Sequence, residues 1–211
     1  MKIMAPIIEV SNDIIKGLDQ LKIPYKLRKS ERATQDEYIK LPSGIYTARE
    51  RTIFNKNWFD QHKILKESVL RMQIPLEFVE LLKYAKENDE ELYDEITKVR
   101  SPWRAENLDA YFEKREDGRY ILTHNKTKAE KLDPETLMED RTPGISIESW
   151  LKNPTKQGLP RKDVEAGDLF YLYPRNVTVA RFSANGGRAY LDCGGDPSDK
   201  SGDLGVRAVK R

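Results

Sequence analysis

Cysteine and histidine are almost absent from this chain. Its 211 residues contain one cysteine, Cys193, and two histidines, His62 and His124, which lie far apart in the sequence. A single thiol excludes an intrachain disulfide, a cysteine-rich zinc site and a two-thiol redox centre. Two separated histidines do not indicate a histidine cluster for iron. We therefore expect no cofactor and no metal-ligating residues.

These three side chains are the first candidates for catalysis, and each has a simpler interpretation. Cys193 ends the segment AYLDC with no histidine near it in sequence, which predicts a small buried thiol rather than a nucleophile. His62 shares a helical face with Trp58 and Leu65, which predicts a structural role. His124 lies in a polar segment, and we expect it to be solvated. We expect no catalytic residue, and the protein is predicted not to be an enzyme.

Long apolar runs and a strong net charge are also missing. No run approaches 18 apolar residues, and the start, MKIMAPIIEVSND, lacks the apolar core and cleavage site of a secretory signal. We expect no membrane span, no signal peptide and synthesis in the cytoplasm. Lysine plus arginine (37) nearly cancel aspartate plus glutamate (35). Because a dedicated nucleic-acid binder carries a basic footprint, we do not expect nucleic acid as a partner.

The residues that are present indicate a folded α+β protein. Hydrophobic residues make up 38% and charged residues 34%, a globular composition. Helical periodicity dominates the first half and short strands dominate the second, rather than alternating βαβ units. The sequence Asp117-Gly118 favours a hairpin turn. The periodicity predicts helices over 7–27, 54–68, 71–88 and 87–99, with Pro75 as a first helical residue, and strands over 169–173, 177–184, 188–193 and 204–209.

Two stretches resemble one protein family. Residues 71–78, RMQIPLEF, resemble the helix-opening pattern R-L-P-T-x-x-E-W of proteins with the formylglycine-generating-enzyme variant of the C-type lectin fold. Residues 204–209, LGVRAV, are similar to the closing G-F-R-x-V strand of that fold. Gln73 and Ile74 replace the Pro-Thr pair, and Val206 replaces the aromatic residue.

The resemblance implies a fold and a domain organisation. Residues 45–211 would form a C-type-lectin-like domain, with helices packed on a small antiparallel sheet and long irregular loops as the binding face. The resemblance leaves residues 1–44 unexplained, and their helical periodicity predicts an N-terminal helical extension. Arg207, in the closing strand, would be a structural arginine that reaches an internal acidic or carbonyl partner. Formylglycine-generating enzymes use paired cysteines, so their activity does not carry over to a chain with Cys193 alone.

Within that fold, the branch that fits best is the variable proteins of diversity-generating retroelements, which occur in phages, bacteria and archaeal viruses. These proteins are similar in placing a ligand-binding surface just before a C-terminal G-x-R strand. The resemblance implies a non-enzymatic module that binds a protein or cell-surface ligand, a role compatible with association with a virion or display at a surface. Six of the 12 glycines lie between Gly186 and Gly205, and their loops would form the surface that this strand holds.

The candidate binding surface spans residues 182–203. Its side chains mix aromatic, amide and cationic groups, the composition of paratopes. Strand alternation over 188–193 directs three polar or aromatic side chains outward and Ala189, Leu191 and Cys193 toward the core. The predicted ligand-binding residues are Phe182, Ser183, Asn185, Arg188, Tyr190, Asp192, Asp196 and Lys200.

Three other interpretations stay open. The surface over 182–203 could be ordinary polar surface. The carboxylates of Asp192, Asp196, Asp199 and Asp203 could hold a metal in an enzyme of the same broad fold, although their spacing matches no EF-hand and favours solvated turn residues. The chain could also be a virion or assembly protein that docks through its charged residues 1–40.

Overall fold

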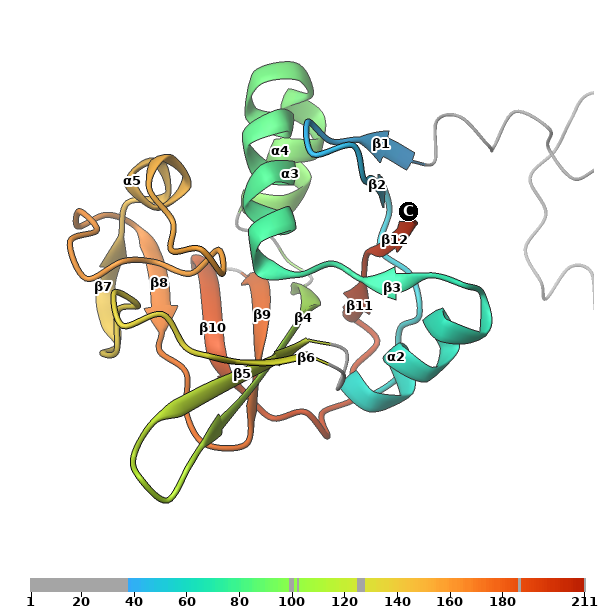
Figure 1. The fold of residues 1–211 in the computed structure, drawn as a ribbon. Helices are drawn as coiled ribbons and strands as arrows, with labels where there is room; N and C mark the ends of the chain where they lie inside the picture. Colours follow the sequence, from blue (N-terminus) through green and yellow to red (C-terminus); the bar gives the residue numbers. More distant parts are fainter. Residues whose placement is uncertain (1–37, 99–100, 102, 125–127, 186, 211) are drawn as a thin grey trace, which may run out of the picture. The chain divides into compact units, whose positions relative to one another are not determined.

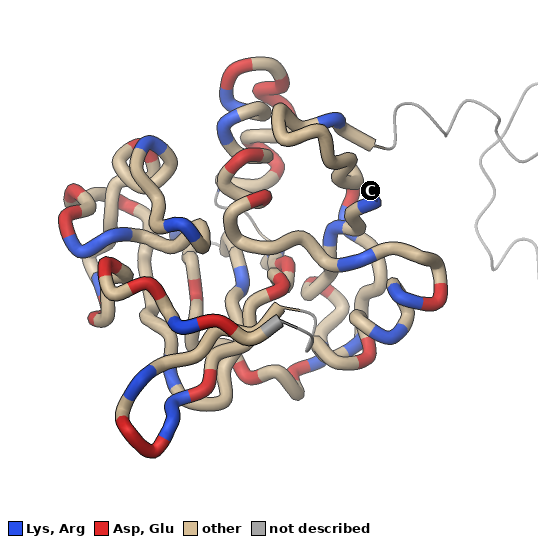
Figure 2. Tube along the Cα trace, in the orientation of Figure 1, with Lys and Arg blue, Asp and Glu red and all other residues tan. Residues whose placement is uncertain are grey.

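The computed structural model describes residues 38–98, 101, 103–124, 128–185 and 187–210. The fold of this part is α+β, as the sequence predicts, and it contains more strand than helix. Figure 1 shows the helices gathered around a large sheet and a smaller one. The expected helix over 7–27 and most of the expected extension, residues 1–37, lie outside the described residues. Figure 2 shows acidic and basic residues of both signs scattered over the described trace.

The smaller sheet joins the beginning of the described chain to its end. β12 lies between β2 and β3, with Val209 beside Thr47 and also beside Arg71 (Figure 1). β1 belongs to the sequence segment 1–44 and pairs with β2. The strands, in spatial order, are β1 (Tyr38–Lys40), β2 (Tyr46–Ala48), β12 (Ala208–Lys210) and β3 (Arg71–Met72).

The larger sheet has eight strands, so the expectation of a small antiparallel sheet is wrong. β10 lies between β8 and β9. It pairs antiparallel with β9 and parallel with β8. A second parallel pair joins β11 (Leu204–Val206) to the start of β4. The other strands, in spatial order, are β6 (Lys128–Lys131), β5 (Tyr120–His124), β4 (Arg104–Lys114), β9 (Thr178–Ala184), β10 (Ala189–Gly195), β8 (Leu169–Leu172) and β7 (Arg141–Ile145).

The helices begin where local chemistry favours a start. α3 starts at Pro75, whose fixed φ suits a first helical position. The carboxylate of Glu77 accepts a hydrogen bond from the backbone of Ile74 (3.1 Å) and forms two with the guanidinium of Arg71 (2.6 and 2.7 Å). Ser146 is the N-cap of α5, and its side-chain oxygen accepts a hydrogen bond from the Ser149 amide (3.1 Å). The helices are α2 (Trp58–Glu67), α3 (Pro75–Asn88), α4 (Glu90–Thr97) and α5 (Ile147–Lys152).

Apolar side chains cover both faces of the large sheet. The main cluster lies between the sheet and α3, α4 and α5, and has Phe182 near its centre, 5.1 Å from the Phe78 ring and stacked at 6.5 Å on Trp150. A second cluster includes Trp58 of α2 and Val206 of β11. All seven residues of β9 are buried: Ala180 and Phe182 belong to the main cluster, Val179 belongs to the second, and Arg181 donates to Asn107 Oδ1 (3.0 Å).

Arg207 is the structural arginine that the resemblance implies. Its side chain is buried, and its Nε donates to Glu106 Oε2 (2.8 Å) while Nη2 donates to Glu95 Oε2 (2.6 Å). Nη1 donates to the Arg49 carbonyl. Glu106 is itself fully buried and also pairs with buried Arg104. This ion network connects β4, α4 and the junction between β11 and β12, so it ties the two sheets together.

Val69 closes α2 in a conformation that favours glycine. Its φ is 58°, and the hydrogen bonds from Val69 N to Lys66 O (3.1 Å) and from Leu70 N to Leu65 O (2.9 Å) form a Schellman motif. The side chain is 91% exposed, so it adds strain without packing. We expect Val69→Gly to raise the free energy of unfolding by roughly 1 kcal/mol in urea titrations, and Val69→Ala to raise it less. A lower urea midpoint for Val69→Gly would contradict this.

Candidate functional site

Two of the predicted ligand-binding residues lie in the core. Phe182 is 0% exposed and Ser183 is 9% exposed, because β9 lies between β4 and β10 and is covered on both faces. A surface ligand cannot contact the Phe182 ring. The prediction was wrong for these two residues because it assumed that one face of the strand meets solvent.

The predicted alternation along β10 is confirmed. Leu191 and Cys193 are fully buried on one face, while Tyr190 and Asp192 are half-buried on the other and Arg188, just before the strand, is exposed. Burial raises the pKa of the Cys193 thiol well above its ordinary value, so the thiol stays protonated. Cys193 is therefore the buried small side chain that the sequence predicts.

An aromatic and cationic cluster occupies the outward face of β10 and β8. The guanidinium carbon of Arg188 lies 4.2 Å from the Phe170 ring centroid, within the range of a cation–π contact. The Phe170 ring meets the Tyr190 ring edge-on at 5.5 Å, and the two residues are neighbours in the parallel β8–β10 pairing. We call Arg188, Phe170 and Tyr190 the β10 platform. Phe170 was missed, although the alternation of LFYL over 169–172 places it opposite the buried Leu169 and Tyr171.

Asp192 carries a charge that the fold disfavours. Burial raises its pKa above the ordinary value of 3.8, while its Oδ1 accepts a hydrogen bond from the Gly194 amide (2.8 Å). As the pH rises through 3.8 the unfolded chain loses this proton first. The folded state then binds more protons than the unfolded chain does. The Asp192 carboxyl group therefore lowers the free energy of unfolding as the pH rises toward its folded-state pKa.

Asp192→Asn is therefore expected to stabilise the protein at neutral pH. Asparagine keeps the acceptor for the Gly194 amide and cannot ionise. The free energy of unfolding of the variant should exceed that of the wild type at pH 7, and the difference should shrink as the pH falls below 3.8, where the wild-type carboxylate becomes protonated in both states. Urea titrations of both proteins at each pH measure this. Equal differences across the pH range would contradict the role assigned to ionisation.

The remaining predicted residues belong to turns. Arg181, which is buried, pairs with Asp199 (2.8 Å) and donates to the backbone carbonyl of Asp196. The Asp196 carboxylate accepts from the amide and the hydroxyl of Ser198 (2.8 and 2.7 Å), which lowers its pKa. Asn185 accepts from the Gly187 amide (3.2 Å) and Lys200 is exposed. The aspartates thus hold loop geometry. In the residues that the structure describes, no three histidine, cysteine or acidic side chains gather where they could hold a metal.

At two positions between residues 186 and 205, glycine allows neighbouring atoms to pack closely and does not form exposed loop surface. A Cβ on Gly195 would lie 2.7 Å from the Arg181 Nε, and one on Gly205 would lie 2.7 Å from the Phe54 ring. Both glycines lie in strands, β10 and β11. The expectation that the glycine-rich segment is loop surface does not hold for Gly195, whereas Gly205 lies in the strand predicted over 204–209.

The fold brings the two histidines to one residue, Asp109 of β4. His62 Nε2 lies 3.3 Å from Asp109 Oδ1, and His124 Nδ1 lies 2.5 Å from the Asp109 carbonyl oxygen. His62 also packs edge-on against Trp58, which agrees with its predicted structural role. His124 is 15% exposed and its Nε2 lies 3.4 Å from Glu130, so the prediction of a solvated side chain was wrong.

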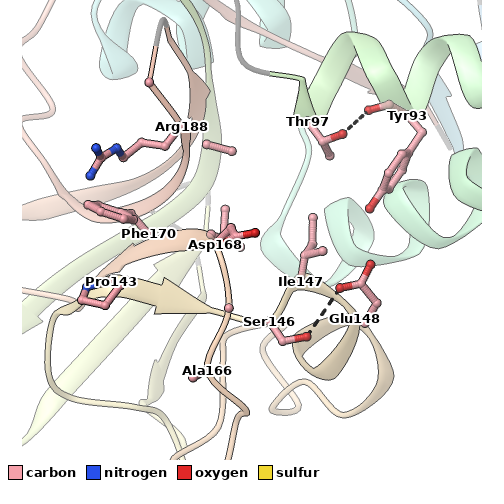
Figure 3. Close-up of a pocket in the computed structure, with 14 residues that line it drawn as sticks. Tyr93, Thr97, Pro143, Ser146, Ile147, Glu148, Ala166, Asp168, Phe170 and Arg188 are labelled. Atoms are coloured by element: carbon pink, nitrogen blue, oxygen red, sulfur yellow. Dashed lines mark hydrogen bonds between the residues drawn. The ribbon is translucent and has the colours of Figure 1, made fainter.

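A groove of about 800 Å³ lies beside the β10 platform. Residues of α4, the start of α5, β7 and the first residues of β8 and β10 line it. Figure 3 shows Arg188, Phe170 and Pro143 on one side and Tyr93 and Thr97 on the other. Burial raises the pKa of Tyr93, so its hydroxyl is neutral and available as a hydrogen-bond donor.

The chain matches no family model, no curated protein and no solved structure. Among the described residues, no helix is both long enough and apolar enough to cross a membrane.

Proposed function

We propose that the protein is a non-enzymatic ligand-binding module of C-type-lectin-like architecture whose binding surface is built on β10. The β10 platform is the observation that carries this proposal, because tyrosine, phenylalanine and arginine form the energetic centres of many interfaces. These side chains stand on paired strands, so little conformational freedom is lost when a ligand binds. Asp192 supports the proposal as well, since burial disfavours its charge and a destabilising residue is kept on the outward face of β10.

The family likeness is supported by three features of the fold. The first and last described strands meet in one sheet through β2 and β12. Arg71 and Glu77, which carry the helix-opening resemblance, form a bidentate ion pair. Arg207, which carries the closing resemblance, is buried and paired with Glu106. We therefore propose that the chain is a variable protein of a diversity-generating retroelement, with a protein or cell-surface ligand.

The candidate reactive groups favour binding over catalysis. The Cys193 thiol is buried and protonated, and His62 packs against Trp58 in the second apolar cluster. Neither group lies beside the groove. The chemistry offered at the groove is recognition through stacking, hydrogen bonds and charge.

Deep sequencing of the 3′ end of the gene, in many clones from its source population, tests the proposal. The structure specifies which codons we expect to vary and which we expect to stay constant. Substitutions should concentrate in codons of outward residues such as Arg188, Tyr190 and Asp192, and should fall at template adenines. The codons of Phe182 and Leu191 should stay constant because both side chains fill the core. A uniform sequence over codons 182–203 would remove the retroelement assignment, and substitutions at Phe182 and Leu191 would contradict the assigned surface.

A further inference from the structure

Two opposite charges stand unpaired at the edge of the groove. Arg188 immediately precedes β10 and Asp168 immediately precedes β8, and these strands run parallel with Tyr190 beside Phe170. Arg188 and Asp168 are therefore neighbours across the ladder, and both are exposed. Instead of pairing with Asp168, the guanidinium lies over the Phe170 ring. Within the part of the chain that the structure describes, neither charge forms an ion pair.

The stacked guanidinium is prepared to receive a carboxylate. Contact with the Phe170 ring occupies one face of the planar group and leaves its N–H edge free. That edge matches a carboxylate with two parallel hydrogen bonds. The neighbouring Asp168 carboxylate would repel a doubly charged phosphate, so the site favours a singly charged anion whose own cationic or N–H group can face Asp168.

The other acid of the groove already has a partner. Glu148 lies 2.8 Å from Lys86 of α3, and this hydrogen bond lowers the pKa of Glu148 and raises that of Lys86. The Glu148 charge is thereby balanced by that of Lys86, which leaves Asp168 as the carboxylate that can accept a cationic group of a ligand. Figure 3 shows Ile147 between Asp168 and Glu148 and Pro143 on the side of Phe170, and both supply apolar surface to the groove.

We propose that this groove binds an extended peptide segment of a partner protein, with an acidic side chain on Arg188 and a basic side chain on Asp168. The groove is open to solvent and is lined by four separate segments of chain, which suits an extended peptide. Its volume of about 800 Å³ falls in the range of specific ligand sites, roughly 300–1,000 Å³. This inference rests on the proposed function and specifies the chemistry of its ligand.

The test is selection from a random heptapeptide library displayed on phage, with the full chain immobilised. Enriched peptides should carry aspartate or glutamate a few residues from lysine or arginine. Synthetic copies of two such peptides are then titrated by fluorescence anisotropy. Arg188→Glu and Asp168→Lys should each weaken binding at least tenfold. The double variant should prefer peptides in which the acidic and basic positions are exchanged.

Arg115→Glu is the matched control, because Arg115 is exposed at the distant β4–β5 turn. It should leave the affinity unchanged, and equal melting temperatures should show that all variants fold. No enriched peptide, or enrichment without charge preference, overturns the inference. If Tyr190→Ala weakens binding but Asp168→Lys does not, the groove inference fails and the proposed function stands. If no variant of the β10 platform or of Asp168 changes the affinity, the proposed binding surface fails as well.

Discussion

Glu106→Ala is expected to lower the free energy of unfolding by roughly 3–5 kcal/mol, because removal of one partner leaves buried charges uncompensated. Glu106 is fully buried and accepts hydrogen bonds from two buried guanidinium groups, those of Arg104 and Arg207. Without this carboxylate, Glu95 alone would face both cations. Urea unfolding followed by circular dichroism measures the loss.

Glu113→Ala is the matched control for this substitution. Glu113 is on the same strand, β4, but is only half-buried, so its removal should change stability by no more than about 0.5 kcal/mol. Glu106→Gln keeps the shape and removes the charge, and it should also destabilise the protein. A loss below about 1 kcal/mol for Glu106→Ala would show that the network does not hold the sheets together.

Phe182→Ala is expected to cost roughly 3–5 kcal/mol, the usual effect of deleting a buried aromatic ring. The ring lies between Phe78 and Trp150, so its removal leaves a cavity between α3, α5 and the large sheet. Thermal and urea unfolding both measure the loss. The substitution also distinguishes the two roles considered for Phe182, a ligand contact and a core side chain. Removal of a phenylalanine that contacts ligand on the surface would leave the fold stable.

Phe170→Ala is the comparison that makes this test specific. Phe170 is on the outward side of β8 and is only half-buried, so its loss should destabilise the protein much less than the loss of Phe182. The same substitution should remove the support beneath the Arg188 guanidinium and weaken binding of the peptides selected on the wild type. If Phe182→Ala left the free energy of unfolding unchanged, the packing described for Phe182 on a covered face of β9 would be wrong.

The ion network and the core together explain why the β10 platform can be rigid. Arg207 connects the last strands to β4 and α4, and Phe182 connects β9 to α3 and α5. β10 pairs with β9 on one side and with β8 on the other. The platform therefore stands on a strand held on both edges, which keeps Arg188 and Tyr190 in place before a ligand arrives.

Local sequence patterns were sufficient for several elements. Pro75 and the apolar spacing of 78–85 predict α3 and its buried face, and Asp117-Gly118 predicts the β4–β5 hairpin. Alternation predicts which side chains of β10 point outward. These predictions succeed because each depends on the backbone preference or periodicity of a single segment.

The candidate site depended on contacts that no single segment specifies. Burial of Phe182 requires that Phe78 of α3 and Trp150 of α5 cover its face of β9. The stacking of Arg188 on Phe170 requires that β10 insert beside β8. The groove likewise forms where α4, α5 and β8 meet. The sequence by itself determined the α+β class and several periodic elements, and the resemblance of residues 204–209 implied the structural role of Arg207. Only the tertiary structure decided which polar residues meet, because strand order and the covering of a face depend on segments distant in the chain.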